Sequence, residues 1–367
     1  MSLNSGIVGL PNVGKSTLFN ALTSSQNAQV ANYPFCTIEP NFGTVIIPDE
    51  RIDTLVKIYN PKKTVPSTIE FVDIAGLVKN ASKGEGLGNQ FLAHIRLVDA
   101  IIHIVRCFED ENVTHVDGEI NPEKDIDTVE IELILKDLDT LNKRMEKVSK
   151  SVRIGEKKLQ HELDILKGLK EHFNKLRLAR YFIQELDDEG KAVVNDLYLL
   201  TDKPVLYVAN VDDHSLEGNK YSDVVKQIAE KEKEEFLIMS VEMESEIALI
   251  ESLEERDAFL HEMGLKEPGL NILIREAYRL LNLITFFTVS EKEVHSWTIH
   301  KGIKAQQAAG EIHTDFEKGF IRAEVMKFND LKQWGSEHII KEKGLLHIEG
   351  KDYIVQDGDI MYYRFNV

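Results

Sequence analysis

GIVGLPNVGKST, at residues 6–17, is the most informative stretch of this chain. An apolar run enters it, and LFNAL, at residues 18–22, leaves it with the spacing of a helix. The stretch fits the phosphate-loop pattern G-x-x-x-x-G-K-[ST] at Gly9, Gly14, Lys15 and Ser16. In such a loop, backbone N–H groups wrap a phosphate at a helix N-terminus, the lysine reaches the β- and γ-phosphates, and the serine hydroxyl binds Mg²⁺. A chance glycine-rich turn is the alternative, but the strand before it and the helix after it argue against that. The stretch predicts binding of a nucleoside triphosphate.

The composition limits what the chain can do. With 367 residues, 43% of them hydrophobic, it can bury a core in two or three domains. Its 44 basic and 62 acidic residues give a formal net charge of -18, which argues against a protein that coats nucleic acid with its whole surface but allows a local basic patch. The sequence shows no secretory signal, no apolar run long enough to span a bilayer, and two cysteines, Cys36 and Cys107. We expect a cytoplasmic protein with reduced thiols and no membrane partner.

Two motifs after the phosphate loop have the positions of GTPase switch regions. Thr37 lies in a proline-containing segment, residues 32–41, where switch I supplies a second Mg²⁺ ligand; an ordinary surface threonine is the alternative. The apolar segment TIEFVD, residues 68–73, ends at Asp73, and Gly76 completes an Asp-x-x-Gly motif. Such a motif places a carboxylate beside the metal and a glycine N–H against the γ-phosphate, so loss of that phosphate releases the following loop. The spacing favours a switch-type nucleotide hydrolase over a small-molecule kinase.

The residue after this motif is unusual for a GTPase. Leu77 stands where many such enzymes have a glutamine that orients the attacking water, and an aliphatic side chain cannot hydrogen-bond water. Hydrolysis must therefore be slow or use another group. His115, in a polar loop at residues 108–118, is our candidate for that group; a solvated loop histidine is the alternative. We expect the catalytic groups to be Lys15, Gly76 and His115.

Two long amphipathic segments begin near residue 128. Apolar residues step by three and four through the first at Ile131, Ile134, Leu138, Leu141, Met145, Val148 and Val152. They continue through the second at Leu159, Leu163, Leu166, Leu169, Phe173 and Leu176. The interruption at residues 149–155 predicts an antiparallel coiled-coil hairpin of two helices of comparable length. Basic side chains gather toward its tip, as a ribosome or RNA contact or as an ordinary solvated face: Lys143, Arg144, Lys147, Lys150, Arg153, Lys157 and Lys158.

The strand predicted at residues 203–213 ends where a nucleotide-binding fold reads the base. GTPases have Asn-Lys-x-Asp there, and this chain keeps Asn210 and Asp213 but has Val211 in place of the lysine. After the next strand, at residues 236–239, it has Ser-Val-Glu and not the Ser-Ala-Lys loop of a guanine site. Base recognition is therefore altered. The expected nucleotide contacts are Asn12, Val13, Gly14, Lys15, Ser16, Thr17, Asn210, Val211, Asp213, Ser240 and Val241. The expected Mg²⁺ ligands are Ser16, Thr37 and Asp73.

The alternation of strands and helices predicts an α/β fold in several parts. We expect a P-loop domain with a mostly parallel sheet at residues 4–127 and 201–281, interrupted by the helical arm at residues 128–200. Helices are expected near residues 251–263 and 271–281. Residues 282–367 predict a separate α+β module, with strands at 285–289, 294–299, 320–325, 353–355 and 360–365 around a helix near residues 305–310.

Five longer motifs together resemble the YchF / Obg-like ATPase family of translation-factor-class P-loop proteins, over nearly the whole chain. They are GLPNVGKS (9–16), residues 32–41, DIAGL (73–77), GEGLGNQF (84–91) and AAGEIHTDFEKGFIRA (308–323). The last is similar to the signature of the family's C-terminal TGS domain, a ubiquitin-like β-grasp module. The resemblance implies a G domain, an inserted coiled-coil arm and a TGS domain. It also implies a slow Mg²⁺-dependent switch that hydrolyses ATP in preference to GTP, associates with ribosomes and is linked to oxidative-stress responses.

The resemblance carries over to single residues. Leu77 matches the family's hydrophobic substitution, and His115 matches a loop histidine proposed to assist hydrolysis. Asn12 resembles the residue that binds K⁺ in cation-dependent relatives. Asp213 departs from the family's usual glutamate, and a carboxylate at this position fits the two donors of guanine, so a GTP-preferring switch is the alternative. A second alternative is a nucleotide-gated ribosome- or RNA-binding module in which hydrolysis is incidental. We expect a monomer and no DNA partner in each case.

Overall fold

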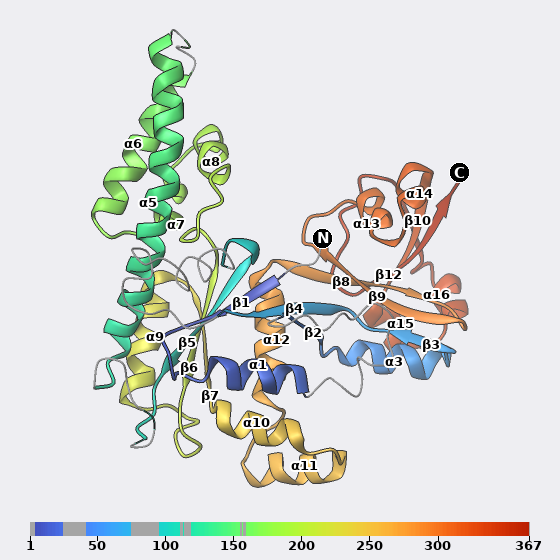
Figure 1. The fold of residues 1–367 in the computed structure, drawn as a ribbon. Helices are drawn as coiled ribbons and strands as arrows, with labels where there is room; N and C mark the ends of the chain where they lie inside the picture. The colour runs from blue at the N-terminus through green and yellow to red at the C-terminus, as the bar shows by residue number, and fades with distance from the viewer. Residues whose placement is uncertain are drawn as a thin grey trace. The chain divides into compact units, whose positions relative to one another are not determined.

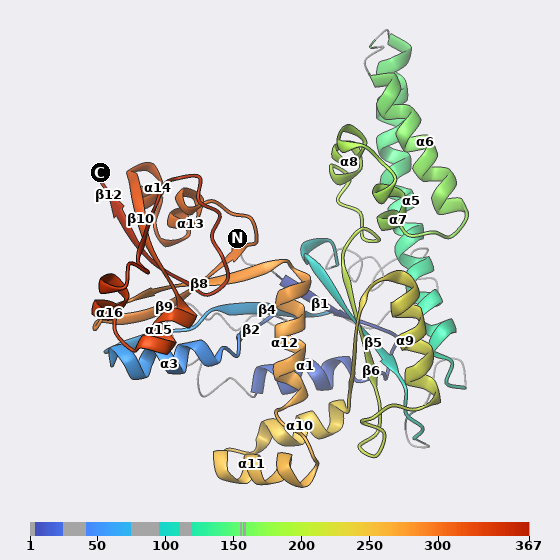
Figure 2. The same cartoon turned by 180° about the vertical axis from the view of Figure 1, so that it is seen from behind.

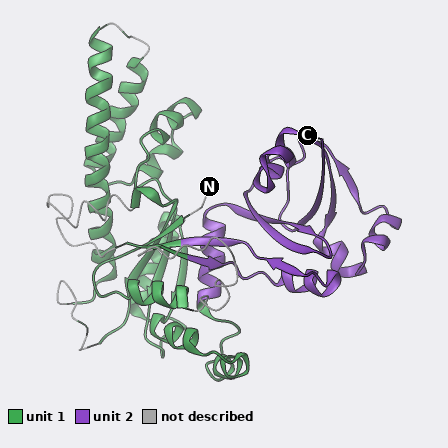
Figure 3. Cartoon of the chain, turned by 45° about the vertical axis from the view of Figure 1, so that its right-hand side comes forward, with its two compact units in different colours: residues 1–25, 39–43, 71–269 green, residues 26–38, 44–70, 270–367 purple. Residues whose placement is uncertain are grey.

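The computed structural model describes residues 4–24, 42–74, 95–110, 113, 119–154, 156 and 159–366. The chain divides into two compact units, coloured separately in Figure 3. Unit 1 consists of residues 1–25, 39–43 and 71–269, and unit 2 consists of residues 26–38, 44–70 and 270–367. Within the described ranges, no helix is both long enough and apolar enough to cross a membrane.

Unit 1 is built around a mostly parallel sheet (Figure 1). The strand order is β2-β4-β1-β5-β6-β7. The strands are β1 (Asn4–Val8), β2 (Phe42–Ile46), β4 (Thr68–Asp73), β5 (Ala100–Arg106), β6 (Val205–Asn210) and β7 (Glu235–Met239). Residues 44–46 of β2 and 68–70 of β4 are grouped with unit 2, so the division between the units falls within these two strands. β1 with β5, β5 with β6, and β6 with β7 pair in parallel. β5 and β6 are buried along their whole length, as is usual for parallel strands covered on both faces. The predicted α/β class is confirmed.

Unit 1 also contains the helices that follow the strands of this sheet. They are α1 (Lys15–Ser24), α9 (Lys220–Glu232), α10 (Val241–Leu249) and α11 (Leu253–Glu262). α9 begins with a capping box in which Asn219 Oδ1 accepts from the backbone N–H of Ser222 and Ser222 Oγ accepts from that of Asn219. Figure 2 shows α9 beside the lower part of α5. The sequence predicted α11 but neither α9 nor α10.

The arm is a long helix with shorter helices packed against it (Figures 1 and 2). The helices are α5 (Pro122–Ile154), α6 (Gln160–Asn174), α7 (Ala179–Gln184) and α8 (Asp188–Asn195). Most residues of the two predicted apolar series share one core, which includes Leu141, Val148, Leu166 and Phe173 but neither Ile131 nor Leu176. The expectation of two helices of comparable length is wrong, because α5 has 33 residues and α6 has 15. The chain leaves the helical conformation at Leu176, which has a φ of 54° and a 57% exposed side chain.

A buried carboxylate ties the arm to the segment that precedes β6. Asp137 of α5 is fully buried. Its oxygens accept hydrogen bonds from the backbone N–H groups of Leu200 and Thr201, both at 2.9 Å, and from Thr201 Oγ1 at 2.7 Å. Burial raises the Asp137 pKa to about 6, although these hydrogen bonds act in the opposite direction. A buried acid with all these donors fixes the base of α5 against the sheet domain.

Unit 2 contains a second sheet, with strand order β11-β10-β12-β8-β9-β3. Its strands are β3 (Lys63–Val65), β8 (Leu283–Val289), β9 (Glu293–His300), β10 (Phe320–Lys327), β11 (His347–Glu349) and β12 (Asp359–Phe365). The helices of this part are α3 (Glu50–Tyr59), α12 (Gly269–Leu280), α13 (Ala305–Ile312), α14 (Thr314–Lys318), α15 (Phe328–Trp334) and α16 (Glu337–Glu342). The strand predicted at residues 353–355 is only an isolated bridge between Lys304 and Ile354. The Tyr353 carbonyl accepts from the backbone N–H of Ala305, the first residue of α13, and the Val355 N–H donates to the Ile303 carbonyl. These two hydrogen bonds do not continue into a β-ladder.

Residues 44–70 belong to unit 2, although we expected them in the P-loop domain. β3 pairs in parallel with β9, from Lys63 opposite Glu293 to Val65 opposite His295. Leu55 of α3 is fully buried in one core with Phe287 of β8. Residues 270–281 also lie in unit 2 and not in the P-loop domain. These associations join segments that are far apart in sequence, and for that reason local patterns did not predict them.

Candidate nucleotide site

The phosphate loop connects β1 to α1 (Figure 1). Gly14 has a φ of +101°, and a Cβ atom on it would lie 2.6 Å from Asn210 Nδ2, so both the backbone and the space require glycine. Asn12 has a φ of 62°, in the left-handed region that asparagine tolerates better than most residues. Lys15 is the first residue of α1. The first N–H groups of a helix lack intrahelical acceptors, so this loop can bind an anion through its backbone.

Lys15 is held close to the loop. Its side chain is 7% exposed, and Nζ donates a hydrogen bond of 2.6 Å to the Leu10 carbonyl. Burial lowers the pKa of Lys15 from 10.5 to about 8, while the Asp73 carboxylate acts in the opposite direction. A bound phosphate would favour the charged ammonium. Lys15 is therefore placed to exchange a neutral carbonyl for an anionic ligand.

Ser16 and Asp73 form the metal-binding side of the loop. Ser16 Oγ donates a hydrogen bond of 3.1 Å to Asp73 Oδ2. Asp73 Oδ1 is buried and has no hydrogen-bond partner among the described residues. The described part of the chain contains no cluster of three or more His, Cys, Asp or Glu residues that could enclose a metal. Mg²⁺ commonly binds one or two protein oxygens together with substrate phosphates, so this pair fits Mg²⁺ bound with a nucleotide.

Asn210, the last residue of β6, joins the phosphate loop to α10. Its Nδ2 donates to the Val13 carbonyl and its Oδ1 accepts from the Val241 backbone N–H, each at 3.0 Å. The Asn210 side chain is 4% exposed, so these bonds are shielded from water. Val13 and Val241 are themselves buried. The Asn210 amide thus fixes the distance between the phosphate loop and the start of α10.

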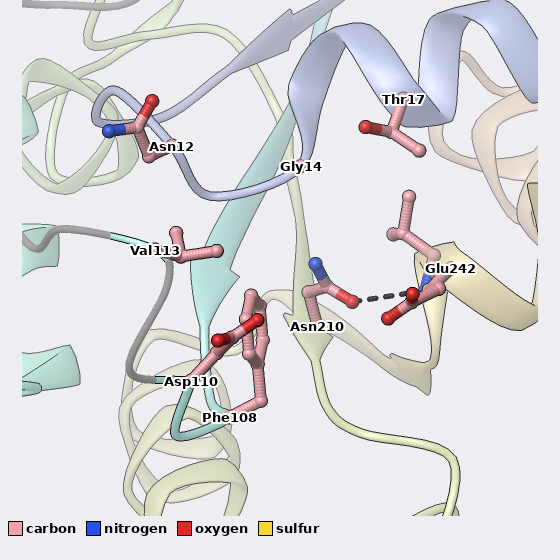
Figure 4. Close-up of a pocket in the computed structure, with 9 residues that line it drawn as sticks. Asn12, Gly14, Thr17, Phe108, Asp110, Val113, Asn210 and Glu242 are labelled. Atoms are coloured by element: carbon pink, nitrogen blue, oxygen red, sulfur yellow. Dashed lines mark hydrogen bonds between the residues drawn. The ribbon is translucent and has the colours of Figure 1, made fainter.

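A cavity of about 550 Å³ opens beside the loop (Figure 4). It is lined by Asn12, Gly14, Thr17, Phe108, Asp110, Val113, Asn210, Val241 and Glu242. Its volume is in the usual range for a small-molecule site. The sequence predicted the loop residues, Asn210 and Val241. It missed Phe108, Asp110, Val113 and Glu242, although the rule that ligands bind beyond the carboxyl ends of parallel strands points to the residues after β5.

The remaining predicted base contacts lie beside the cavity and not in its lining. Asp213 is half-buried, and the Ser240 hydroxyl donates to its Oδ1. The same hydroxyl accepts from the Met243 backbone N–H at 3.2 Å and so caps α10. Val211 is buried, and its backbone N–H donates to the Met239 carbonyl at 3.0 Å. Thr37, Gly76 and His115 lie outside the described residues, as do Leu77 and Cys36.

Comparison with known proteins identifies the family. Residues 4–143 match the MMR_HSR1 family model, described as "50S ribosome-binding GTPase". Residues 283–366 match the YchF-GTPase_C model, described as "Protein of unknown function (DUF933)". The curated protein "Ribosome-binding ATPase YchF" from Bacillus subtilis (strain 168) is 51% identical over 370 residues, with full coverage of both chains. This chain belongs to the YchF family.

Other YchF proteins are similar over the same length. The protein of that name from Escherichia coli O157:H7 is also 51% identical, over 367 residues and all of both chains. A solved structure described as "Structure of the Schizosaccharomyces pombe YchF GTPase" matches with a TM-score of 0.88 and 38% identity, covering 99% of this chain and 98% of the other. The bacterial relatives are thus called ATPases and the fission yeast relative a GTPase. The expected family and fold are confirmed.

Proposed function

We propose that this YchF protein is a slow Mg²⁺-dependent ATPase that acts as a nucleotide switch on ribosomes. The observation that carries the proposal is the group formed by Lys15, Ser16 and Asp73. It combines a buried lysine on a phosphate loop with a carboxylate oxygen that has no partner among residues 4–24, 42–74 and the other described ranges. These residues have the chemistry that phosphoryl transfer requires, which is almost entirely positioning and electrostatic stabilisation.

In this proposal each residue has a definite task. Lys15 would leave the Leu10 carbonyl to bind the β- and γ-phosphates. Ser16 and Asp73 would hold Mg²⁺, with Thr37 as a further ligand. Mg²⁺ would neutralise charge that develops on the phosphates. Gly76 contacts the γ-phosphate through its backbone N–H. Loss of the γ-phosphate after hydrolysis therefore releases the loop that follows Gly76.

The water that attacks the γ-phosphate needs a group other than residue 77. Leu77 cannot orient water, and we propose that His115 does so. K⁺ bound near Asn12 is a further part of the proposal. It rests on the resemblance of Asn12 to the cation-binding residue of other P-loop proteins.

We propose ATP as the preferred nucleotide. Val211 is buried and so offers no long stem to cover a base, and Glu242 brings a carboxylate into the cavity where a guanine site has a lysine. The bacterial YchF relatives are named ATPases. Asp213 supports the alternative of GTP, and so does the name of the fission yeast relative. The two are separated by calorimetric titration of the Mg²⁺ complexes of both nucleotides, in which tighter binding of GTP would reverse the assignment.

The ribosome is the proposed partner, reached in the cytoplasm by a monomer. The names of the bacterial relatives support this choice. The distal part of α5 exposes Lys143, Lys147, Lys150 and Arg153, which suit contact with RNA phosphates on an otherwise acidic protein. Glu146, which pairs with Lys150 at 2.6 Å, is the acid among them on this stretch of the helix. We propose that the C-terminal part is a TGS domain that contributes to the same association, and that neither DNA nor a membrane is bound.

Co-sedimentation with ribosomes tests the switch directly. The protein is sedimented with ribosomes in the presence of ADP or a non-hydrolysable ATP analogue, and we expect the retained fraction to depend on the nucleotide. Lys15→Ala should abolish hydrolysis and this dependence together. His115→Ala should slow hydrolysis and preserve nucleotide-dependent retention, which is the result expected if hydrolysis only resets the switch. If the unmodified protein sediments with ribosomes equally well with ADP and with the ATP analogue, the switch is contradicted.

A charge reversal tests the arm. Lys143→Glu with Lys147→Glu should reduce ribosome retention several-fold and make the remainder less sensitive to salt. Lys226→Glu with Lys231→Glu, at two exposed positions on α9, makes the same change of net charge away from the arm and serves as the control. Equal losses from the arm and control variants would show that net charge, and not the arm, decides retention.

A further inference from the structure

Arg106 is a buried arginine at the end of β5 that the proposed mechanism does not use. The residue is 2% exposed. Its guanidinium donates hydrogen bonds to three backbone carbonyls of the segment that follows: Nε to Phe108 at 3.1 Å, Nη2 to Asp110 at 3.3 Å and Nη1 to Val113 at 2.8 Å. All three hydrogen bonds go to main-chain carbonyls, so the planar guanidinium holds the backbone at residues 108, 110 and 113.

The three residues held in this way are pocket residues. Phe108, Asp110 and Val113 all line the cavity, and Figure 4 shows them together on one side of it, across from Asn210 and Glu242. The Arg106 guanidinium also lies over the Phe108 ring, 4.7 Å from its centroid. The same side chain therefore fixes both the backbone of this wall and the orientation of its aromatic ring.

Other bonds hold the start of the wall from a different side. The Cys107 backbone N–H donates to the Asn210 carbonyl at 2.8 Å, and Asn219 Nδ2 donates to the Cys107 carbonyl at 2.7 Å. Tyr221, in the first turn of α9, donates to Glu109 at 2.6 Å. Residues 107 and 109 are thus anchored to β6 and α9. Arg106 holds the carbonyls of Phe108, Asp110 and Val113, and the Asp110 carbonyl also accepts from the Val113 backbone N–H at 3.3 Å, a bond within the wall itself. Removing the guanidinium would take away the bonds that tie Phe108 and Val113 to β5, while residues 107 and 109 keep their own anchors.

We propose that Arg106 is a positioning residue of the nucleotide site, which holds Phe108, Asp110 and Val113 as a preformed wall against the bound nucleotide. This inference rests on the proposed nucleotide binding. Its chemical consequence is specific. An aromatic ring stacks on any base, so the wall should contribute affinity for adenine and guanine nucleotides alike and little discrimination between them. Pre-forming the wall lowers the ordering cost of binding.

A double-mutant cycle on ADP binding separates this role from a purely structural one. Calorimetry with Mg²⁺-ADP measures the unmodified protein, Arg106→Met, Phe108→Leu and the double variant. We expect each single substitution to weaken ADP binding about 10-fold. The double variant should have nearly the same affinity as the single variant that binds ADP less tightly, because each substitution removes the same wall. Losses that multiply in the double variant would show that Arg106 does not act through Phe108 and would overturn the proposal.

Arg180 supplies a matched control. Its side chain is 10% exposed and is bound to Glu232 and Glu234 in unit 1, at 3.3 and 3.2 Å, and it does not line the cavity. Arg180→Met should lower the melting temperature as Arg106→Met does, but leave ADP affinity within 2-fold of the original. If both arginine variants weaken ADP binding equally, Arg106 is only a structural residue. Where Arg106→Met fails to fold, Arg106→Lys enters the same cycle, and it should bind ADP more tightly than the Met variant where both fold.

The experiment also distinguishes this inference from the proposed function. If the unmodified protein binds neither ADP nor ATP, the nucleotide site itself is wrong. If it binds ADP and Lys15→Ala abolishes binding, but Arg106→Met binds as well as the original, only the role of Arg106 is refuted. The ratio of ATP to GTP affinity adds a second readout, because Arg106→Met should leave this ratio unchanged.

Discussion

The hydroxyl of Ser16 lies 3.1 Å from Oδ2 of Asp73, which brings the start of α1 and the end of β4 together at the metal-binding side of the phosphate loop. The other oxygen of Asp73, Oδ1, is buried and has no hydrogen-bond partner within the part of the chain that the structure describes. A buried carboxylate oxygen is costly unless something binds it, so the arrangement favours a site completed by a cation.

Asp73→Asn should therefore separate metal binding from nucleotide binding. The amide keeps the shape of the side chain but removes its charge, so we expect Mg²⁺-dependent hydrolysis to fall by roughly 10²- to 10³-fold, the size seen when one electrostatic stabiliser is removed. Steady-state phosphate release measures this. ADP affinity in the presence of EDTA should stay the same, and a matching loss of metal-free binding would show that Asp73 supports the loop and not the metal.

Asn210→Ala should destabilise unit 1 and weaken nucleotide binding together. The substitution leaves the Val13 carbonyl and the Val241 N–H without their partner in a buried position, which costs about 2 kcal/mol. Urea denaturation measures the free energy of unfolding. Ser24→Ala removes a hydroxyl that bonds to the Asn20 carbonyl on the helix surface and should change stability by less than about 0.5 kcal/mol. Equal effects of the two variants would contradict a special role for Asn210.

The phosphate side of the site could be predicted from sequence because its residues are local. Gly14, Lys15 and Ser16 are contiguous, and the β1–loop–α1 unit that carries them is set by short-range propensity and a required glycine. Asp73 could be predicted because it ends an apolar strand and begins an Asp-x-x-Gly motif. Asn210 could be predicted because it also ends an apolar strand, at the position of the GTPase base motif.

The other wall of the pocket could not be predicted in the same way. Phe108 and Glu242 follow different strands and come together only when β5, β6 and β7 take their order in the sheet. Their types are also common in ordinary loops and helix starts, so nothing in the local sequence marks them. The same limit applies to β3 and α3, which pack with strands more than two hundred residues later in the chain. Local patterns predict elements well, whereas a site or core made of distant segments depends on tertiary packing.

Nucleotide binding should take up protons above neutral pH because of Lys15. In the free protein the Lys15 pKa is about 8, lowered from 10.5. Between pH 8 and pH 10.5 the unfolded chain therefore binds more protons than the folded protein, and the free energy of unfolding rises with pH in this window. A bound phosphate stabilises the ammonium and raises its pKa. At pH 8.5 we expect binding of Mg²⁺-ADP to take up a fraction of a proton, measured by calorimetry in buffers of different ionisation enthalpy. At pH 6.5 the lysine is already charged, so this uptake should vanish, and uptake that is the same at both pH values would rule out Lys15 as its source.

Glu242→Lys should shift nucleotide preference toward GTP. Glu242 is exposed in the first turn of α10 and lines the cavity, where its carboxylate repels the O6 acceptor of guanine and suits the amino group of adenine. A lysine would reverse this, and we expect the ratio of GTP to ATP affinity to rise by about 10-fold, or roughly 1.4 kcal/mol. Glu246→Lys makes the same change of charge one turn later, at an exposed position of α10 outside the cavity lining, and should leave the ratio unchanged. Competitive titration with both nucleotides gives the ratio. A shift of equal size in the two variants would assign it to the general field of α10, and no shift in either would leave Asp213 as the residue that sets the choice of base.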